Sequence, residues 1–343
     1  MKIFLANSQH DAELWREFVD NHPESSNYHR WGWRRVIENA LHWPVYYLMA
    51  ETNGRIKGIL PLVWQKSWMF GSFLTSLPFL NSGGVIAESL EIEQALMQEA
   101  ITLAQRLGVK HIELRHRRSH DLGLPVKTSK VAVVLAIEPN EERMLQSLRK
   151  ETRNLIRKAQ KHGLTAEIFG EEGLDDFYEI FARNMRDLGT PVYSKSFFRE
   201  IWRVFPTETN ICVVLHKTQP VAAGFLTGFR DTVEVAWASS LRKYLPMAPN
   251  MLLYWRMLRF AAERGYRVFD FGRSTPGSGS HRFKLQWSSQ EVQLYWHYWL
   301  SKGNQFPELN PNNPKFRMAL WLWRRLPLRV TKWAGPAVVR CLP

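Results

Sequence analysis

Apolar positions predict a hairpin, a helix and a further strand in the first half of the chain. Asn53-Gly54 separates the two strands of the hairpin, and this pair favours the positive backbone angles of a tight turn. Gly108 ends the helix. The predicted ranges are 45–51 and 55–63 for the hairpin, 88–107 for the helix and 111–115 for the strand.

The second half repeats this order with one more strand. A three-stranded meander, with a turn predicted at Gln219-Pro220, is followed by a helix that ends at Gly265 and by a strand. The predicted ranges are 210–217, 221–229 and 232–239 for the meander, 251–264 for the helix and 267–272 for the last strand.

Short stretches of the two halves are also alike in sequence. IKGIL (56–60) resembles AAGFL (222–226), and RLGVKHIEL (106–114) resembles ERGYRVFDF (263–271). The first pair lies 166 positions apart and the second 157 positions apart. Order and spacing together favour two copies of one structural unit.

A single basic helix is predicted between the copies, at residues 140–162. Asn140 can cap it, and Gly163 suits its end. One face is apolar, and a second face carries a cation every fourth residue. The apolar face consists of Leu145, Leu148, Thr152, Leu155 and Ala159, and the cationic face of Arg149, Arg153, Arg157 and Lys161. The cationic face is either an ordinary solvated surface or a binding surface for an anionic substrate.

Composition favours a globular protein with anionic partners. The chain has 343 residues, 45% of them hydrophobic, and a formal net charge of +14. Its two cysteines suit a reducing cytoplasm rather than a disulfide framework. The N-terminus lacks the apolar region of a signal peptide, and the longest uncharged stretch, at residues 67–87, is interrupted by Gly, Pro and Asn, so no spanning helix is predicted.

The C-terminal tail, residues 304–343, is basic and rich in tryptophan. Its sequence is compatible with a helix but does not require one. No acidic residue follows Glu308, whereas Trp321, Trp323 and Trp333 are interleaved with arginine and lysine. Such a segment either lies in a membrane interface or docks as a terminal helix on the rest of the protein.

The stretch DFGRSTPGSGSHRFKLQW (270–287) contains three glycines but is not a nucleotide-binding motif. Ser278 and Gly279 stand where a P-loop needs lysine and a hydroxyl residue. The dinucleotide fingerprint also fails, because no third glycine follows at the required spacing.

Two segments resemble the Fem family of acyltransferases. LRKETRNLIRKAQKHGL (148–164) is similar to the basic helix that opens the second domain of that family, and FDFGRSTPGSGSHRFKLQW (269–287) to the segment that closes its core. The similarity covers roughly residues 1–300. It is greatest to the Fem-like proteins associated with exosortase (PEP-CTERM) and exopolysaccharide loci.

This resemblance implies an α/β (α+β) fold with two tandem GNAT-like domains, in which helices flank mixed, splayed sheets. The expected boundaries are residues 1–138 for the first domain, 139–303 for the second and 304–343 for the tail. The resemblance also implies transfer of an acyl or aminoacyl group to an amine. The donor would be acyl-CoA or aminoacyl-tRNA, with no permanently bound cofactor and no metal.

Carried over by position, Lys284 matches the family lysine near the donor phosphates, and Arg153 and Arg157 match the basic helix. The chain lacks the glycine-rich pyrophosphate loop of the CoA-dependent enzymes. Arg242, Lys243 and Asn250 occupy the corresponding place, which leaves the donor open. The chain also lacks the long coiled-coil arm of some Fem enzymes.

Acyl transfer to an amine needs positioning, a proton acceptor and stabilisation of the oxyanion. Asp270 is a proton acceptor or orienting group, or else it pairs with Arg273 or caps the turn. His281 is a base by its ordinary pKa, or else a solvated loop histidine. Trp237 and Trp287 are expected in the core. The remaining predicted substrate-binding residues are Arg273, Ser274 and Arg282 in the loop and Asn184 and Tyr193 beside an acceptor site.

Three functions therefore stay open. The first is an acyl or aminoacyl transferase that modifies a cell-envelope or exopolysaccharide precursor, in the cytoplasm or on the inner face of its membrane. The second is a CoA-dependent N-acetyltransferase that acts on an amino sugar. The third is a non-catalytic basic protein that binds nucleic acid or membrane on a GNAT scaffold.

Overall fold

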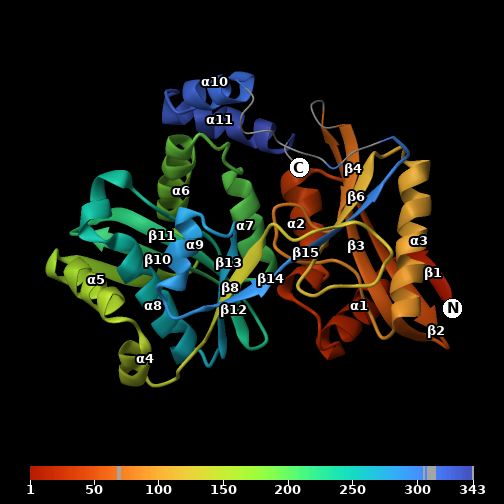
Figure 1. Cartoon of the computed structure of the whole chain (residues 1–343), viewed down its shortest axis with the longest axis horizontal. Helices are drawn as coiled ribbons and strands as arrows, with labels where there is room; N and C mark the ends of the chain where they lie inside the picture. The colour runs from red at the N-terminus through yellow and green to blue at the C-terminus, as the bar shows by residue number, and fades with distance from the viewer. Residues whose placement is uncertain (68–70, 304–305, 307–313, 342–343) are drawn as a thin grey trace. The chain divides into compact units, whose positions relative to one another are not determined.

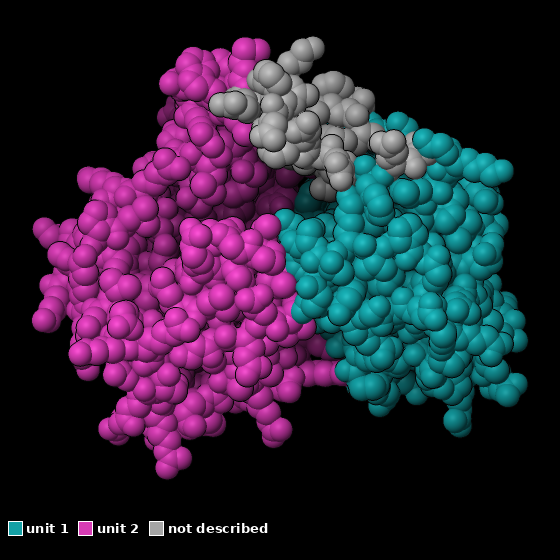
Figure 2. Space-filling model, in the orientation of Figure 1, with its two compact units in different colours: residues 1–130, 293–309, 340–343 teal, residues 131–292, 310–339 magenta. Residues whose placement is uncertain are grey.

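A computed structural model describes residues 1–67, 71–303, 306 and 314–341. The chain divides into two compact units, coloured separately in Figure 2. Unit 1 contains residues 1–130, 293–309 and 340–343, and unit 2 contains residues 131–292 and 310–339.

Unit 1 is built on a mixed eight-stranded sheet (Figure 1). Its main path runs β1-β2-β3-β4-β6-β15-β7, and β5 pairs with β3. The strands are β1 (Lys2–Leu5), β2 (Val45–Thr52), β3 (Arg55–Ser67), β4 (Gly71–Thr75), β5 (Ile86–Ala87), β6 (His111–His116), β7 (Val126–Lys127) and β15 (Tyr295–Leu300). The helices are α1 (Gln9–Asn21), η1 (Asn27–His29), α2 (Gly32–Leu41) and α3 (Leu90–Arg106).

Unit 2 is built on a mixed seven-stranded sheet in the order β14-β8-β13-β12-β11-β10-β9. The strands are β8 (Val131–Ala136), β9 (Leu164–Phe169), β10 (Thr209–His216), β11 (Gln219–Phe229), β12 (Thr232–Ser240), β13 (Val268–Ser274) and β14 (Gln290–Gln293). The helices are α4 (Glu141–Ser147), α5 (Lys150–Lys161), η2 (Glu171–Gly173), α6 (Leu174–Leu188), α7 (Lys195–Val204), η3 (Arg242–Met247), α8 (Pro249–Glu263), α9 (Gly279–Leu285), α10 (Pro314–Trp323) and α11 (Leu328–Val339).

The predicted hairpin of unit 1 is confirmed as β2 and β3. Asn53 and Gly54 have φ angles of 52° and 73°, which are the left-handed values that this tight turn requires. The predicted helix is α3, which Ser89 caps, and Gly108 follows it with a φ of 61°. The pattern of apolar residues therefore located each element to within a few residues.

The internal repeat is confirmed by the order and pairing of the elements. In each unit a helix follows a meander, and the strand after that helix pairs in parallel with the last strand of the meander. The parallel pairs are β4 with β6 in unit 1 and β12 with β13 in unit 2.

Two glycines that match in the repeat serve the same packing purpose. A Cβ on Gly58 would lie 2.9 Å from Leu96 of α3, and a Cβ on Gly224 would lie 2.7 Å from Met257 of α8. Each helix therefore packs directly on the backbone of the second strand of its meander.

Helices cover both faces of the unit 2 sheet. Gly224 faces α8, and its neighbour Phe225 contacts Phe177 of α6 and Phe198 of α7. Because adjacent residues of a strand point to opposite faces, α8 and the pair α6–α7 lie on different sides of the sheet. α5 packs beside α8 and shares its hydrophobic core.

The predicted turn at Gln219-Pro220 was wrong by two residues. The turn is at Lys217 and Thr218, and Lys217 has a φ of 58°. Pro220 lies in β11 opposite Leu215, next to a register shift between Val214 and Leu215. Proline lacks an N–H donor, and a strand accommodates it at such an irregularity.

The single basic helix predicted at residues 140–162 is two helices, α4 and α5. Leu148 and Arg149 adopt extended backbone angles between them, with ψ values of 150° and 147°. The guanidinium of Arg153 donates to the carbonyls of Gln146 (2.8 Å) and Leu148 (3.2 Å), which satisfies acceptors at the end of α4. The Asn140 cap is confirmed.

The unit boundaries differ from the predicted boundaries at 138/139 and 303/304. β8 pairs with β13 of the unit 2 sheet, and β15 pairs with β6 of the unit 1 sheet. Each sheet thus recruits a strand from the far side of the expected boundary. Local sequence patterns contain no information about such long-range pairing.

Two helices, α10 and α11, occupy the described part of the C-terminal tail. Residues 304–305, 307–313 and 342–343 of the predicted tail lie outside the described residues. Among the helices described, none is long and apolar enough to cross a membrane.

Candidate active site

The parallel ladder between β12 and β13 is short. Three Cα pairs join the two strands within the described structure, and the last of them is Glu234 with Asp270. Beyond this pair β12 continues to Ser240 and β13 to Ser274. The ends of the two strands therefore part at a pair of buried acidic residues, 5% and 0% exposed.

Asp270 shapes the strand just beyond that point. Its Oδ1 accepts a hydrogen bond of 2.7 Å from the backbone N–H of Gly272. Gly272 has a φ of 74°, and the register against β8 shifts between Asp270 and Arg273. The carboxylate thus holds a bulge that requires glycine, which agrees with the turn-capping alternative for Asp270.

Lys284 reaches this bulge from α9. Its Nζ donates to the carbonyls of Gly272 and Arg273, both at 2.9 Å, and the residue is 8% exposed. Burial lowers the pKa of Lys284 to about 8, although the charges of Asp270 and Glu234 act in the opposite direction. The site therefore contains a desolvated ammonium close to its titration point at neutral pH.

Ser274 ends β13, directly after Arg273, whose carbonyl accepts from this ammonium. The residue is 4% exposed, and its hydroxyl has no hydrogen-bond partner among the described residues. A buried hydroxyl without a partner is costly in a protein unless a ligand or water completes its bonding. The structure thus brings four predicted site residues together: Asp270, Arg273, Ser274 and Lys284.

His281 is buried rather than solvated, contrary to the loop-histidine alternative. It is 6% exposed in α9, and its Nδ1 accepts a 3.1 Å bond from the N–H of Gly277. That bond places the proton of the neutral ring on Nε2, which lies 3.1 Å from Oε1 of Glu291. Arg282 is exposed and donates to the carbonyl of Gly277 at 2.9 Å. Both residues therefore stabilise the turn before α9.

A second group of predicted residues lies along the free end of β12. Nδ2 of Asn184 on α6 donates to the Ser239 hydroxyl at 3.0 Å. The ring of Tyr193 packs edge-on against Trp237 at a centroid distance of 6.2 Å. The guanidinium of Arg242 donates to the carbonyl of Asp187 at 3.2 Å. These side chains are placed by α6 and β12, not by the loop that holds Lys284.

The expected place of a pyrophosphate loop is occupied by η3. Its backbone N–H groups are engaged locally: those of Tyr244 and Ala248 donate to Leu241 and Leu245. Asn250 lies in the first turn of α8, directly after Pro249. The amides of Tyr244 and Ala248 are therefore engaged by the chain itself.

The cationic face of α5 is partly used by the fold. Arg153 caps α4, whereas Arg157, Arg149 and Lys161 are exposed. Thr152 links α5 to the end of α9 through a 2.9 Å bond from its hydroxyl to the carbonyl of Gln286. Trp287 is fully buried and Trp237 is 8% exposed, so both belong to the core as predicted.

Sequence reasoning missed Glu234 and Ser239. Both lie in the run TVEVAWASS, where apolar residues alternate with smaller or polar ones. Alternation assigns Glu234 to the strand face opposite Val233, Val235 and Trp237, so the local pattern does not mark this acid as buried. The contact of each residue also depends on a partner far away in the sequence.

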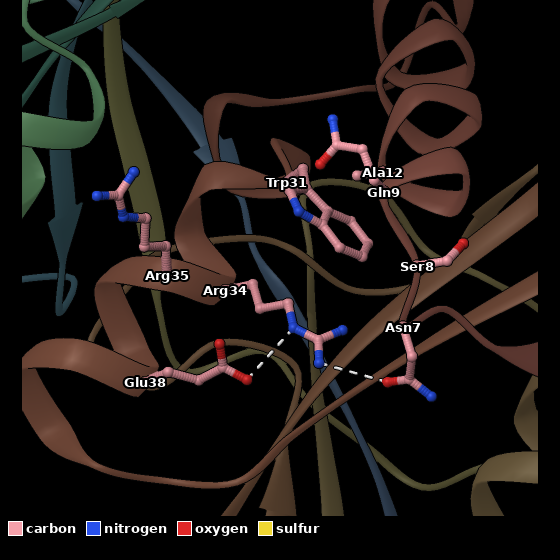
Figure 3. A pocket seen from close by; sticks show the side chains of 8 residues that line it. All are labelled: Asn7, Ser8, Gln9, Ala12, Trp31, Arg34, Arg35 and Glu38. Atoms are coloured by element: carbon pink, nitrogen blue, oxygen red, sulfur yellow. Dashed lines mark hydrogen bonds and ion pairs between the residues drawn. The ribbon is translucent and has the colours of Figure 1, made fainter.

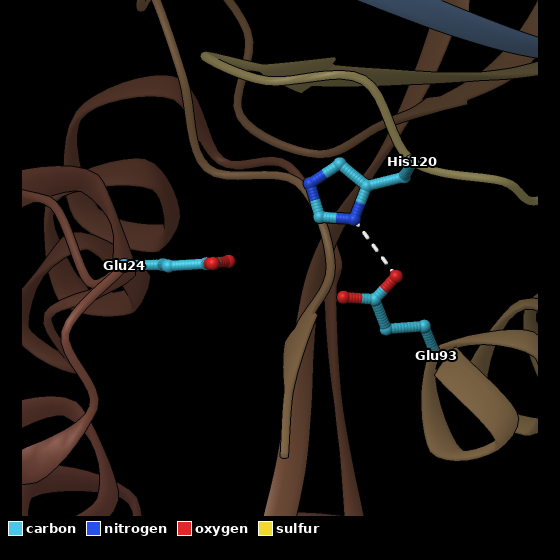
Figure 4. Close-up of side chains that lie close together, drawn as sticks. All are labelled: Glu24, Glu93 and His120. Atoms are coloured by element: carbon cyan, nitrogen blue, oxygen red, sulfur yellow. Dashed lines mark hydrogen bonds and ion pairs between the residues drawn. The ribbon is translucent and has the colours of Figure 1, made fainter. Parts of the chain in front are cut away.

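One group of side chains in unit 1 has metal-ligand chemistry. Oxygen and nitrogen atoms of Glu24, Glu93 and His120 lie within 4.8 Å of one another (Figure 4). His120 Nδ1 lies 2.8 Å from Glu93 Oε2, and Arg118 makes ion pairs with both carboxylates. Arg118 therefore links the two acids, and the described residues form an ion-pair network here.

Unit 1 also has a shallow hollow of about 230 Å³ beside α1 and α2 (Figure 3). Arg34 lies in its wall and donates to Ala6 (2.6 Å), Glu38 (3.3 Å) and Asn7 (3.4 Å). Because other residues of the protein already bind this guanidinium, the hollow is a poorer candidate than the Lys284 site for binding an anionic ligand.

Two sheets, each with one parallel pair of strands, give the chain a tandem GNAT-like fold. Residues 146–285 match the family model described as "Acetyltransferase (GNAT) domain". The match contains the parallel pair, α8 and Lys284, so an acyltransferase domain carries the candidate site, as predicted.

The resemblance to the Fem-like GNAT acyltransferases is confirmed. The chain is 22% identical over 246 residues to "Lipid II:glycine glycyltransferase" of Staphylococcus aureus, a match that covers 64% of this chain and 55% of that protein. The chain thus matches little more than half the length of this relative.

Two solved structures share the fold. FemX is 15% identical with a TM-score of 0.66, and the match covers 86% of this chain and 97% of that one. A tandem GNAT protein from the clavulanic acid biosynthesis pathway is 10% identical with a TM-score of 0.57, and covers 89% and 99%. Both support the expected pair of GNAT-like domains.

Proposed function

We propose that this protein transfers an acyl or aminoacyl group to an amino group of a cell-envelope or exopolysaccharide precursor. The main support is the position of Lys284, whose buried ammonium reaches the point where β12 and β13 part. The same segment lies within the matched GNAT domain.

The ammonium of Lys284 has the properties that this chemistry needs. Two of its three N–H donors bind the carbonyls of Gly272 and Arg273, and the third can donate to a phosphate or carbonyl oxygen of the donor. A preorganised cation in a desolvated site stabilises negative charge that develops during acyl transfer. Asp270 acts as a positioning residue, because it is fully buried and holds the bulge.

The overall step needs no external redox partner. The amine nitrogen forms a bond to the acyl carbon, and the bond from that carbon to the oxygen or sulfur of the donor breaks. The proton that the amine loses balances the charge on the leaving atom. The protein contributes the orientation of the two substrates and the fixed charge beside them.

An aminoacyl-tRNA is the favoured donor. η3 fills the place where a glycine-rich loop would hold the diphosphate of CoA, and the amides of Tyr244 and Ala248 there donate to the chain itself. The exposed cations of α5 and the net charge of +14 suit a polyanion. Acyl-CoA remains the second candidate donor, and the description of the matched family as acetyltransferases favours it.

The acceptor is proposed to be an envelope precursor that carries an amine. The name of the curated relative gives lipid II as the acceptor of that enzyme. An exopolysaccharide precursor, or an amino sugar for the acetyl-transfer alternative, presents the same nucleophile. A lipid-linked acceptor would place the reaction at the inner face of the cytoplasmic membrane.

The test compares two donors on three proteins. Binding of acetyl-CoA and of a mixed aminoacyl-tRNA preparation is measured for wild type and for Lys284→Ala, with Lys57→Ala in unit 1 as the control. We expect the tRNA to bind wild type and Lys57→Ala about tenfold more tightly than Lys284→Ala. If neither donor distinguishes Lys284→Ala from wild type, the proposed site is wrong.

The salt dependence of binding separates the two donors further. A tRNA held by several cations should lose affinity steeply between 50 and 200 mM salt, by about tenfold or more. Arg157→Glu should weaken tRNA binding and leave acetyl-CoA binding unchanged. A preference for acetyl-CoA that Arg157→Glu leaves intact would establish the acetyl-transfer alternative instead.

A further inference from the structure

The C-terminal helices expose an unusual amount of apolar surface. Six of the eleven exposed large hydrophobic residues in the described part of the chain lie between residues 318 and 338. We refer to these six as the tail patch: Met318 (61%), Trp321 (52%), Leu322 (50%), Val330 (39%), Trp333 (83%) and Val338 (37%).

α11 is docked on unit 2 through one face. Thr331, Gly335 and Val339 recur every fourth residue and are buried. A Cβ on Gly335 would lie 2.9 Å from the Val192 carbonyl oxygen, and Lys332 forms an ion pair with Glu179 of α6. The prediction that the tail packs on the protein is therefore confirmed for this face.

Docking does not explain the opposite face of α11. Val330 and Trp333 lie one turn apart there and are exposed. A surface helix of a water-soluble protein normally carries polar residues on its outer face. α11 thus exposes apolar side chains on the face opposite its docked face, and burial of these side chains requires an apolar partner.

α10 continues this surface with a mixed chemistry. Trp321 and Leu322 are exposed, and the guanidinium of Arg325 stacks on the Trp321 ring at 3.6 Å. Arg324 anchors the helix end by donating to the carbonyl of Leu188 at 3.0 Å. Tryptophan rings paired with arginine are typical of segments that lie between water and lipid.

The charge of the segment identifies the partner. No acidic residue occurs after Glu308. The seven cations that follow are Lys315, Arg317, Arg324, Arg325, Arg329, Lys332 and Arg340. Anionic lipid headgroups attract such a segment, and the hydrocarbon boundary accommodates aliphatic side chains such as Met318, Leu322 and Val330. An RNA partner would use the aromatic rings for stacking but would leave these aliphatic side chains in water.

We propose that α10 and α11 form a peripheral docking surface for an anionic lipid bilayer, with the tail patch inserted among the headgroups. The helices lie on the membrane and do not cross it. This inference rests on the proposed function only for its purpose, which is to bring the enzyme to a lipid-linked acceptor. The binding itself does not depend on the transfer chemistry.

The experiment is flotation of the full chain with vesicles of phosphatidylcholine and phosphatidylglycerol in a 7:3 ratio. Wild type is expected to float with these vesicles and at least tenfold less with pure phosphatidylcholine. Leu322→Ser and Trp333→Ser should each lower the partition coefficient about tenfold. Leu245→Ser is the matched control, because Leu245 is 48% exposed and lies in η3, outside the tail patch.

Several results would overturn the proposal. Equal flotation of wild type and the two tail variants would show that the patch does not contact lipid. A wild-type dimer that Trp333→Ser converts to a monomer would assign the surface to a second copy of the chain. Loss of RNA binding in Trp333→Ser without loss of flotation would assign it to nucleic acid.

A variant of the transfer site separates the two proposals. Lys284→Met should float as well as wild type, because Lys284 is buried in α9 and is not part of the tail patch. If both proteins float but wild type shows no transfer, the proposed function is rejected and the membrane surface is retained. Transfer without flotation would do the reverse.

Discussion

The two repeats share a scaffold and differ at the point where their parallel strands part. Glu113 in β6 and Asp270 in β13 are matching positions, 157 residues apart. Each is buried and is the last residue of a parallel ladder, opposite Thr75 in unit 1 and Glu234 in unit 2. The surroundings of the two acids determine what each unit can do.

In unit 1 the acid is fully engaged by the protein. Arg115 Nε donates to Glu113 Oε1 at 2.6 Å, and the Tyr298 hydroxyl donates to Oε2 at 2.5 Å. Burial by itself raises the pKa of Glu113, but the Arg115 charge and these hydrogen bonds outweigh burial, so the pKa lies below its usual value. Both oxygens of this carboxylate therefore already accept hydrogen bonds from the protein rather than from a substrate.

The chain also fills the space beside that acid. Ser76 donates its N–H to the Glu113 carbonyl and accepts from the N–H of Arg115 at 3.1 Å. A Cβ on Gly84 would lie 2.1 Å from Nε2 of His116, so the backbone passes directly over this ring. The parting strands of unit 1 are thus covered by residues 76–85.

Buried histidines complete this filling. Val85 donates its N–H to His116 Nε2 at 3.0 Å, so the ring proton lies on Nδ1 and points to Nδ1 of His297, also at 3.0 Å. His297 Nε2 in turn donates to the carbonyl of His120 at 3.1 Å. Burial lowers the pKa of His116 well below its usual value and also lowers the pKa of His297, which favours the neutral form of these two rings.

Beside the parting strands, unit 2 has a lysine, whereas unit 1 has residues 76–85 and buried histidines. Lys284 approaches the bulge after Asp270, and the Ser274 hydroxyl at the end of β13 has no partner in the described structure. Duplication therefore preserved the scaffold in both units, whereas the residues at the parting strands give one unit a structural role and the other the candidate site.

The largest expected effect is on transfer. Lys284→Met should lower the rate of acyl transfer about 10²- to 10³-fold, because it removes the charge that stabilises the transition state. Steady-state kinetics with the donor that the binding test selects provide the measurement, and Lys57→Met is the control. Near-wild-type transfer by Lys284→Met would remove the functional contrast between the units.

The reciprocal substitution in unit 1 should affect stability instead. Arg115→Met leaves the buried Glu113 carboxylate without its cation and should cost about 3–5 kcal/mol in the free energy of unfolding. Urea denaturation measures this loss. The double variant Arg115→Met/Glu113→Gln should recover part of the stability, and a loss of transfer in well-folded Arg115→Met would show that unit 1 takes part in the chemistry.

The matching glycines test whether the scaffolds are equivalent. Gly58→Ala should destabilise by about 1–3 kcal/mol, because its Cβ would meet Ala87, Ile92 and Leu96 at 2.7–2.9 Å. Gly224→Ala should cost less, since the nearest atom is the flexible Met257 side chain at 2.7 Å. Thermal unfolding of both variants gives the comparison, and the reverse order would contradict it.

The smallest expected effect is a pH dependence. If the charged form of Lys284 is active, transfer should fall as pH rises through about 8, and Lys284→Arg should lack this inflection. The free energy of unfolding should change in the opposite direction and rise with pH. The unfolded lysine holds its proton up to its ordinary pKa of 10.5, so wild type should gain stability relative to Lys284→Met between pH 8 and 10.5.

The sequence by itself determined the local elements and their repetition. The hairpin at Asn53-Gly54, the helix ends at Gly108 and Gly265, and the 166-residue spacing of Gly58 and Gly224 all follow from local conformational preference and apolar periodicity. These signals are local, and tertiary packing agrees with them.

The tertiary structure alone decided the roles of individual side chains. Asn184 binds the Ser239 hydroxyl and Thr152 binds the carbonyl of Gln286, and these partners lie far away in the sequence at positions that periodicity does not specify. The exchange of β8 and β15 between the expected domains is of the same kind. Matching acids at Glu113 and Asp270 became different sites for this reason: the chemistry of a buried carboxylate depends on which distant residues desolvate and neutralise it.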